Sequence, residues 1–224
     1  MPRLFAIGDI HGCDVALDTL LREISPKRDD VIVGIGDYVD RGPNSAGVLE
    51  ILVDLVSRCR FVPLIGNHEI MMFKGMSGRR DFDFWMTHGG QATLASYGGD
   101  PRAIPQHHML FLSHCVRYHE EEDYFFVHAN YAPDLALDDQ PDDLLFWTHI
   151  FDNVPPPHRS GKTAVVGHTP QVTGEIRNIG HILMIDTHCF GNQWLTAVDL
   201  NEKTFIRTNN LMQIQTGPLP AVSE

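Results

Sequence analysis

The sequence predicts an α/β fold with one largely parallel β-sheet and a second, more mixed sheet. In its first third, short apolar segments alternate with segments whose apolar residues recur at helical spacing. This alternation is typical of βαβ units, in which helices join parallel strands. In the last third, short apolar segments follow one another across tight turns, which indicates strands in a more mixed sheet.

The order of these segments gives the expected elements. We expect strands at residues 4–8, 31–36, 61–66, 124–128, 163–168, 181–186, 194–200 and 204–208, and helices at 14–24 and 45–59. Residues 70–120 have a helical pattern broken by glycines, so we expect a helical insert there. A chain of 224 residues favours one domain. We place that domain at residues 1–210 and a C-terminal tail at 211–224.

Composition and charge narrow the class of protein. The four cysteines are scattered without a CxxC pair, so neither a disulfide framework nor a cysteine zinc site is expected. The chain has no apolar run of the ~18 residues that a membrane span needs, and its first residues lead directly into a strand-like pattern. We therefore expect a cytoplasmic protein. A formal charge of −12 should repel nucleic acids and anionic membranes, so neither is an expected partner.

Polar side chains follow five of the expected strands. In open α/β sheets, ligand sites lie outside the carboxyl ends of the strands, so these residues should converge at one edge. Alone, each aspartate would be interpreted as a turn or cap residue and each histidine as a surface or core residue. Their common position at strand ends, mostly beside glycine, favours a functional site instead. The candidates are Asp9, His11, Asp37, Asn67, His128 and His168.

The chemistry of this set indicates metal binding. Carboxylate, imidazole and amide ligands without thiolate suit manganese, iron or zinc. Six ligands exceed the need of one catalytic zinc ion. They fit a centre with two divalent cations about 3.5–4 Å apart that share a carboxylate. We expect manganese first, with iron or zinc as the other candidates.

The same motifs resemble those of a known family. They are "GDIHG" (8–12), "GDYVDRG" (36–42), "GNHE" (66–69), "HAN" (128–130) and "GHTP" (167–170). Their order and spacing resemble the phosphoprotein phosphatase family of the calcineurin-like metallophosphoesterases. The short chain and "GGQATLASYG" (89–98) are similar to the bacterial and phage branch, which includes lambda phosphatase. The resemblance implies two mixed β-sheets packed as a sandwich with flanking helices.

The resemblance also assigns the metal ligands. It implies that Asp9, His11 and Asp37 bind the first ion, and that Asp37 bridges to the second. The second ion would be bound by Asp37, Asn67, His128 and His168. A water or hydroxide bound to the two metals would attack phosphorus in line.

Catalytic roles follow from the same resemblance. His68 would protonate the leaving oxygen while Asp40 holds its imidazole. Arg41 would bind phosphate oxygens with its planar guanidinium group, and Asn67 would also contact the substrate. The alternative for Asp40 and Arg41 is a surface ion pair.

One departure from the family pattern concerns phosphate binding. The family has a second phosphate-binding arginine after a "LLW" segment, whereas "DLLFWTHIF" has His149 there. Either His149 binds substrate when protonated, or this contact is missing, or a nearby arginine such as Arg159 replaces it. His188 also stands where glycine is usual, and we expect a structural role for it.

The sequence is compatible with three functions. The first is a metal-dependent phosphatase that hydrolyses phosphoserine and phosphothreonine, and also phosphotyrosine, in a protein or peptide, or a small phosphoester. The second is hydrolysis of dinucleoside polyphosphates of the Ap4A type. The third is a non-catalytic metal-binding protein. Retention of Asp40 in "VDRG" favours the phosphatase.

Overall fold

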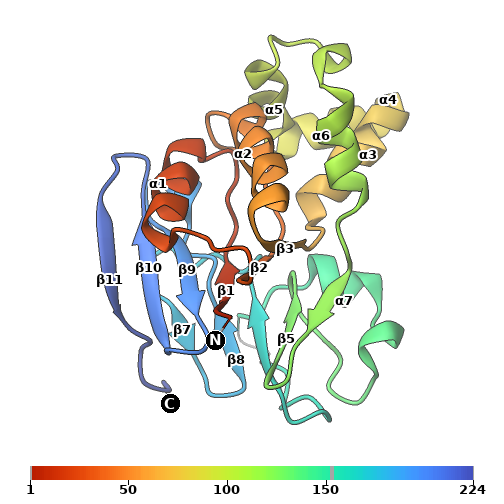
Figure 1. Ribbon diagram of the computed structural model, residues 1–224. Coiled ribbons are helices and arrows are strands. Elements are labelled where there is room, and N and C mark those ends of the chain that lie inside the picture. Colours follow the sequence, from red (N-terminus) through yellow and green to blue (C-terminus); the bar gives the residue numbers. More distant parts are fainter. Residues whose placement is uncertain (1, 152–153, 224) are drawn as a thin grey trace.

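Two β-sheets packed face to face form the centre of the protein (Figure 1). The structure is a computed structural model that describes residues 2–151 and 154–223. The six-stranded sheet has the order β11-β10-β9-β1-β2-β3, and the five-stranded sheet has the order β4-β5-β6-β8-β7. Both sheets contain parallel and antiparallel pairs. The predicted α/β fold with two mixed sheets and flanking helices is confirmed.

The strands are short and contain many buried residues. Those of the first sheet are β1 (Leu4–Ile7), β2 (Val31–Gly34), β3 (Arg60–Pro63), β9 (Leu195–Asp199), β10 (Thr204–Thr208) and β11 (Ile214–Pro218). Those of the second sheet are β4 (Tyr118–Glu120), β5 (Tyr124–Val127), β6 (Thr163–Val166), β7 (Arg177–Asn178) and β8 (Ile182–Met184). Strands β1, β2 and β3 run parallel to one another, as do β5, β6 and β8.

Alternation along the strands builds the layers. In β1, Phe5 and Ile7 pack against helices α1 (Asp14–Ile24) and α2 (Ser45–Arg58), whereas Ala6 packs toward the second sheet. In β5, Phe126 joins the core between the sheets, and its neighbours pack near α7 (Asp142–Trp147). Successive strand residues point to opposite faces, so one strand contributes to two cores. The layers are therefore helix, sheet, sheet and helix.

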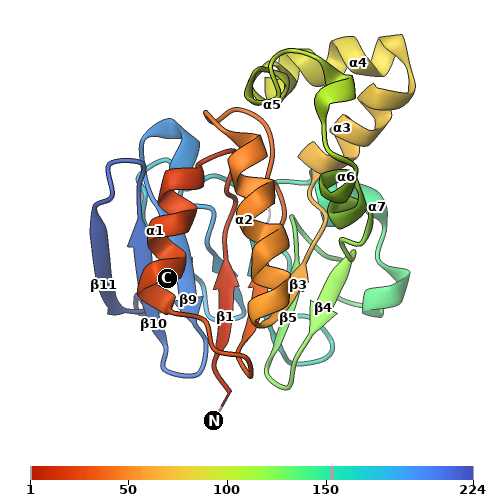
Figure 2. The same ribbon diagram turned by 45° about the horizontal axis from the view of Figure 1, so that its top comes forward.

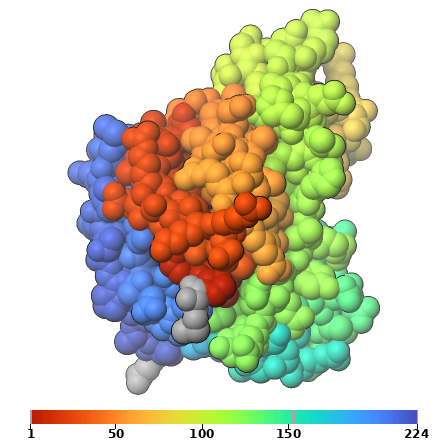
Figure 3. Space-filling view, viewed as in Figure 1, coloured from red at the N-terminus to blue at the C-terminus, as the bar shows by residue number. Residues whose placement is uncertain are grey.

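Helices occupy most of the region between β3 and β4. They are α3 (Asn67–Ser77), α4 (Arg79–Trp85), a π-helical turn (Met86–Gly90), α5 (Gln91–Ser96) and α6 (Gln106–Ser113). Figure 2 shows α3, α4 and α5 extending beyond one end of the sheets. In the space-filling view this yellow and green segment projects above the red and orange part that contains α1 and α2 (Figure 3). Short 3₁₀ turns occur at Pro101–Ala103, Leu137–Asp139 and Cys189–Gly191.

The C-terminal segment differs from the expected tail at 211–224. Within it, Ile214–Pro218 form β11, which pairs antiparallel with β10 and places Thr216 opposite Ile206. Residue 224 lies outside the described residues. The strand was not predicted because its sequence IQTGP contains glycine and proline and most of its residues are exposed.

No helix within residues 2–151 or 154–223 has the length and apolar character of a membrane-spanning segment.

Candidate metal centre and active site

All six strand-end residues proposed as metal ligands lie together where the two sheets end. Asp9 and Asp37 follow β1 and β2, Asn67 begins α3 after β3, and His128 and His168 follow β5 and β6. Contacts between the sheets join them. The backbone N–H of His168 donates to Asp9 Oδ2 at 3.0 Å, and His128 Nε2 lies 3.0 Å from Asn67 Oδ1. The strand-end pattern therefore predicted the grouping of these residues correctly.

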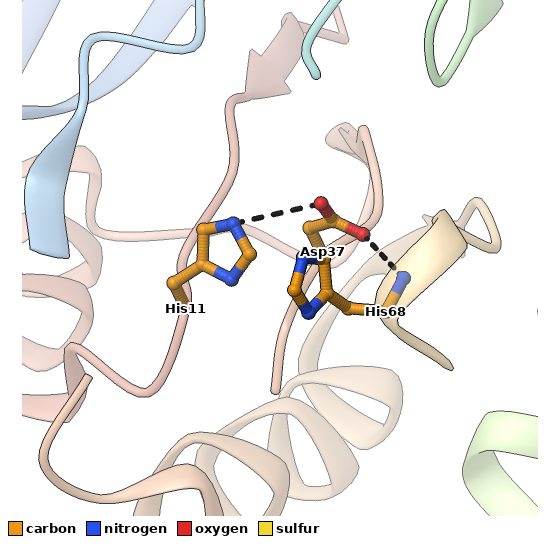
Figure 4. Close-up of side chains that lie close together, drawn as sticks. All are labelled: His11, Asp37 and His68. Carbon is orange, nitrogen blue, oxygen red and sulfur yellow. Dashed lines mark hydrogen bonds and ion pairs between the residues drawn. The ribbon is translucent and has the colours of Figure 1, made fainter. Parts of the chain in front are cut away.

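Asp37 occupies the middle of this group. Figure 4 shows its carboxylate between His11 and the backbone nitrogen of His68. Oδ2 lies 3.5 Å from His11 Nε2, and Oδ1 lies 3.4 Å from His128 Nε2. The Oδ1 atom also accepts from the His68 N–H at 3.0 Å. Each carboxylate oxygen thus faces a different histidine, which is the arrangement that a bridging ligand needs.

Two groups of side chains around Asp37 could hold metal ions. One contains His11, Asp37 and His68, and the other contains Asp37, His128 and His168. In each group the candidate ligand atoms lie within 4.8 Å of one another. The sequence interpretation made His68 a proton donor rather than a ligand. Its Nδ1 is bonded to Asp40, so Nε2 is the nitrogen that remains available.

Unsatisfied atoms at this site fit bound cations. Asp9 Oδ1 and His168 Nε2 are buried and have no hydrogen-bond partner within the described residues. Buried polar atoms are nearly always paired, and an unpaired one costs about 1–3 kcal/mol. One atom is a carboxylate oxygen and the other an imidazole nitrogen, and both are common ligands of divalent transition metals. The chemistry of these residues therefore fits a metal centre.

The backbone at the site is strained. His11, Asp37, Asp40, Arg41 and His168 all have φ between 45° and 71°. Residues other than glycine seldom adopt these angles, and each costs about 1–3 kcal/mol. Such a concentration is typical of functional sites, where surrounding contacts hold the side chains in fixed directions.

Two glycines allow the strand ends to approach one another closely. A Cβ atom on Gly66 would lie 2.1 Å from Asp37 Oδ1, and one on Gly167 would lie 2.0 Å from Asp9 Oδ1. Both distances are far below a van der Waals contact, so neither position can carry a side chain while the carboxylates stay in place. The glycines in "GNHE" and "GHTP" are thus explained by the site.

Burial disfavours charge on the site residues in the absence of counter-ions. It raises the pKa of Asp37 to about 7, and burial together with the charges of Asp186 and Asp37 raises the pKa of Asp9 well above its usual value. Burial also lowers the pKa of His128 to about 4. Metals bind neutral imidazoles and ionised carboxylates. Bound cations would therefore stabilise the ionised carboxylates in spite of their burial.

A buried histidine and aspartate lie beside the metal ligands. His68 Nδ1 is 2.7 Å from Asp40 Oδ2, and both side chains are almost completely buried. Asp40 also accepts from Trp85 Nε1 at 2.9 Å and from Thr93 Oγ1 at 2.7 Å. The predicted contact between Asp40 and His68 is present. His68 Nε2 is buried and has no partner among the described residues.

Arg41 and His149 line the same cavity of about 280 Å³ as His68 and Asn67. Arg41 is exposed, its guanidinium carbon lies 4.9 Å from the Phe190 ring centroid, and its Nη1 lies 3.3 Å from His11 Nε2. These contacts differ from the surface ion pair with Asp40 that was the alternative.

His149 stacks on His168 with ring centroids 4.2 Å apart and an interplanar angle of 17°. Partial burial, and then the charge of Arg41, lower its pKa, which disfavours the protonated form. Arg159 does not line the cavity, and its Nη1 donates to the Asp134 carbonyl at 3.2 Å. His149 is therefore better placed than Arg159 to contact a substrate.

Sequence reasoning assigned no role to Glu69 or Asp186. Glu69 is fully buried, and its carboxylate accepts from the backbone N–H groups of Asp37 and Tyr38 at 2.9 and 2.8 Å. It thereby fixes the loop that carries Asp37. Asp186 follows β8 and is buried, and burial raises its pKa to about 7. The apolar segment "ILMI" before Asp186 is the same strand-end signal that identified Asp9, so this residue could have been found.

His188 is held in place through its backbone N–H and its ring. Its N–H donates to Asp186 Oδ1 at 3.0 Å, its φ is 59°, and its ring meets Phe190 edge-on at 4.6 Å between centroids. The turn between β8 and β9 is thereby fixed beside the site.

Sequence comparison identifies the family. A profile described as calcineurin-like phosphoesterase matches residues 2–191, which is most of the chain. The protein belongs to this family and is a metallophosphoesterase, a hydrolase whose histidines and aspartates are positioned to bind metals.

Relatives within the family have different names. A symmetrical bis(5'-nucleosyl)-tetraphosphatase of Acidovorax ebreus is 44% identical over 79 residues, which cover 34% of this chain and 27% of that protein. The match thus spans about a quarter of that relative's length. An asymmetrical bis(5'-nucleosyl)-tetraphosphatase PrpE of Oceanobacillus iheyensis is 28% identical and covers 89% of both chains. Serine/threonine-protein phosphatase 2 of Salmonella typhimurium is 28% identical to this chain. The matched region covers 84% of this chain and 89% of that protein.

A solved structure supports the fold. The crystal structure of a proposed diadenosine tetraphosphatase matches this structure with a TM-score of 0.68 and a sequence identity of 23%. The match covers 98% of this chain and 96% of that chain.

Proposed function

We propose that this metallophosphoesterase is a phosphoprotein phosphatase of the bacterial and phage branch. It would hydrolyse phosphoserine and phosphothreonine, and also phosphotyrosine, in a protein or peptide. The observation that carries the proposal is the buried pair of His68 and Asp40, with a bond of 2.7 Å at Nδ1 and an unpaired Nε2. That pair can deliver a proton to the oxygen of an alcohol leaving group.

The proposed metal ligands fall into two sets that share Asp37. Asp9, His11 and Asp37 would hold one ion, and Asp37, Asn67, His128 and His168 the other. Manganese is our first candidate, with iron or zinc as alternatives. When bound, the two ions would supply a nucleophilic water whose pKa is lowered toward about 7, and would neutralise charge on phosphate. The unpaired Asp9 Oδ1 and His168 Nε2 support these assignments.

The chain's own side chains would perform the remaining tasks. Arg41 would bind phosphate oxygens with two parallel N–H groups. His68 would donate the proton on Nε2 to the leaving oxygen and become a neutral imidazole, and Asp40, bonded to Nδ1, would stabilise the imidazolium that exists before this transfer. Asn67 and His149 line the same cavity and would contact the phosphate.

The second candidate is hydrolysis of dinucleoside polyphosphates, and a neighbouring cavity favours it. This cavity of about 420 Å³ is lined by Lys74 and Arg80 and shares Met71, Phe84 and Trp147 with the active-site cavity. Cationic side chains can bind further phosphates, and an aromatic side chain can stack on a nucleobase. Two of the relatives described above carry the corresponding name.

A substrate panel with Mn²⁺ separates the candidates. We expect turnover of phosphoserine, phosphothreonine and phosphotyrosine peptides and of an aryl phosphate. Turnover of Ap4A alone would contradict the phosphatase proposal. Turnover of no substrate by the metal-loaded protein would support a non-catalytic metal-binding role.

The protein should bind no nucleic acid or membrane, because its negative charge would repel their phosphate groups. We place the protein in the cytoplasm.

Variants of the neighbouring cavity sharpen this panel. If Ap4A is the substrate, the double substitution Lys74→Ala and Arg80→Ala should raise KM for Ap4A and leave the aryl phosphate unaffected. Arg79→Ala is the matched control, because Arg79 is exposed but does not line the cavity. Equal kinetics of the double variant and the control on Ap4A would show that the cavity does not bind this substrate.

A further inference from the structure

A second group of candidate metal ligands lies between helices α2 and α6. Glu50 belongs to α2, and His107 and His108 belong to the first turn of α6. Glu50 Oε2 lies 3.1 Å from His107 Nε2 and 3.0 Å from His108 Nε2. The three ligand atoms all lie within 4.8 Å of one another. None of the three residues lines the active-site cavity.

We propose that Glu50, His107 and His108 bind one divalent transition-metal ion of the zinc type. Two imidazoles and a carboxylate, with a water in the fourth position, form a common zinc ligand set. Bonds of about 2.0–2.1 Å place tetrahedral ligand atoms roughly 3.3–3.4 Å apart. The two contacts to Glu50 Oε2 are only a few tenths of an ångström shorter than this, so a small outward movement of the carboxylate would admit the ion.

His108 has the surroundings of a metal-binding histidine. Its Nδ1 lies 2.7 Å from the hydroxyl oxygen of Tyr97, while its Nε2 faces Glu50. A hydrogen bond at one ring nitrogen fixes the ring and the tautomer, so the other nitrogen can direct its lone pair at a metal. His108 is buried, and burial lowers its pKa, which favours the neutral imidazole that a metal requires.

The other two ligands leave the ion accessible from solvent. The side chains of Glu50 and His107 are 69% and 51% exposed. An ion could therefore enter directly and keep a water ligand. This ligand set should prefer zinc, nickel or copper over manganese, because affinity for such sites rises along the series from Mn²⁺ to Cu²⁺.

Binding at this position would connect the helical region to the main body. α2 packs on the first sheet, whereas α6 is the last helix of the region that also carries Trp85 and Thr93. Those two side chains hold Asp40. An ion between α2 and α6 would thus fix His108, whose Nδ1 contacts the Tyr97 hydroxyl at the end of α5, without contacting a substrate.

Zinc retention by the full chain tests the proposal. Wild type, Glu50→Gln and His107→Ala are equilibrated with Zn²⁺ and passed through a desalting column, and bound zinc is counted by elemental mass spectrometry. We expect each variant to retain one ion fewer than wild type and to show a smaller rise in Tm with Zn²⁺. His114→Ala is the matched control, since His114 directly follows α6 and its Nδ1 contacts the Leu110 carbonyl oxygen rather than Glu50.

Spectroscopy distinguishes a metal site from a hydrogen-bonded cluster. Co²⁺ added to the Mn²⁺-loaded wild-type protein should give the visible absorption of a four-coordinate ion, and Glu50→Gln should lose it. The Mn²⁺-supported activity of Glu50→Gln should stay at the wild-type level, which confirms an intact fold. Equal zinc retention and equal Co²⁺ spectra in wild type, Glu50→Gln, His107→Ala and His114→Ala would overturn the proposal.

Discussion

His68 is the residue whose proposed role can be tested most selectively. If its Nε2 protonates the leaving oxygen, His68→Ala should lower kcat by about 10²–10⁴ for an alkyl phosphate such as a phosphoserine peptide. The loss should be much smaller for an aryl phosphate with a weakly basic leaving group, because such a group departs without a proton. Steady-state kinetics on both substrates measure this difference, and an equal loss on both would contradict proton donation by His68.

Arg41 is expected to bind phosphate without the help of a second arginine. Its removal in Arg41→Ala should raise KM and weaken inhibition by inorganic phosphate, by about tenfold or more if a charge-assisted contact of roughly 1.5–3 kcal/mol is lost. Arg159→Ala is the control, because Arg159 is exposed and does not line the cavity. Equal effects of the two substitutions would refute the assignment of Arg41.

His149 raises a related question at the residue scale. It lines the active-site cavity and stacks on His168. If it stands where a second phosphate-binding arginine could act, His149→Arg should lower KM for phosphate esters. Unchanged KM and kcat would show that this position does not contact phosphate.

At the scale of elements, the helices between β3 and β4 support the proposed catalytic pair. Trp85 at the end of α4 and Thr93 in α5 both donate to the buried carboxylate of Asp40. Trp85→Phe removes one donor and keeps an aromatic ring in the core. We expect the free energy of unfolding to fall by about 1–3 kcal/mol and kcat to fall, with little change in KM. An unchanged kcat would mean that Asp40 stays in place without Trp85.

The segments before β1 and β2 are joined by an ion pair whose pH dependence can be predicted. Burial raises the pKa of Asp30, but the hydrogen bonds from Arg3 and the Lys27 N–H outweigh it, so the pKa is lowered overall. A lowered folded-state pKa stabilises the fold above the unfolded value, and the stabilisation is lost as the pH falls through the folded value. Wild-type protein should therefore lose stability below about pH 4.

Asp30→Asn tests this ion pair. The variant should unfold more easily by about 1–3 kcal/mol at neutral pH, because a buried hydrogen-bonding partner is lost. The difference from wild type should shrink in acid. Urea unfolding between neutral and acidic pH gives both values, with the exposed neighbour Asp29→Asn as a control. A difference that stays constant with pH would show that Asp30 titrates normally.

At the scale of the whole molecule, local patterns predicted the sheets and the convergence of polar residues at the strand ends. The reason is physical: parallel strands place their carboxyl ends at one edge, so Asp9 and Asp37 could be located together from sequence. The contacts of Asp40 with Trp85 and Thr93 could not be predicted, because they depend on how α4 and α5 pack on a loop more than forty residues earlier.

Strand β11 shows another limit of local patterns. Its residues are mostly exposed, so no alternation of buried and exposed positions marks it as a strand. It is defined instead by its pairing with β10. The position of Glu69 beneath the Asp37 loop is likewise set by tertiary packing, although its motif was visible in the sequence.

We propose that Asp37 bridges two metal ions, and counting the bound metal ions tests this directly. Wild type and Asp37→Asn are dialysed against Mn²⁺, and bound manganese is measured by elemental mass spectrometry, with circular dichroism to confirm folding. We expect two ions per chain in wild type, and in the folded variant the loss of both ions and of activity. Full retention of manganese and activity by Asp37→Asn, or the loss of a single ion, would contradict it.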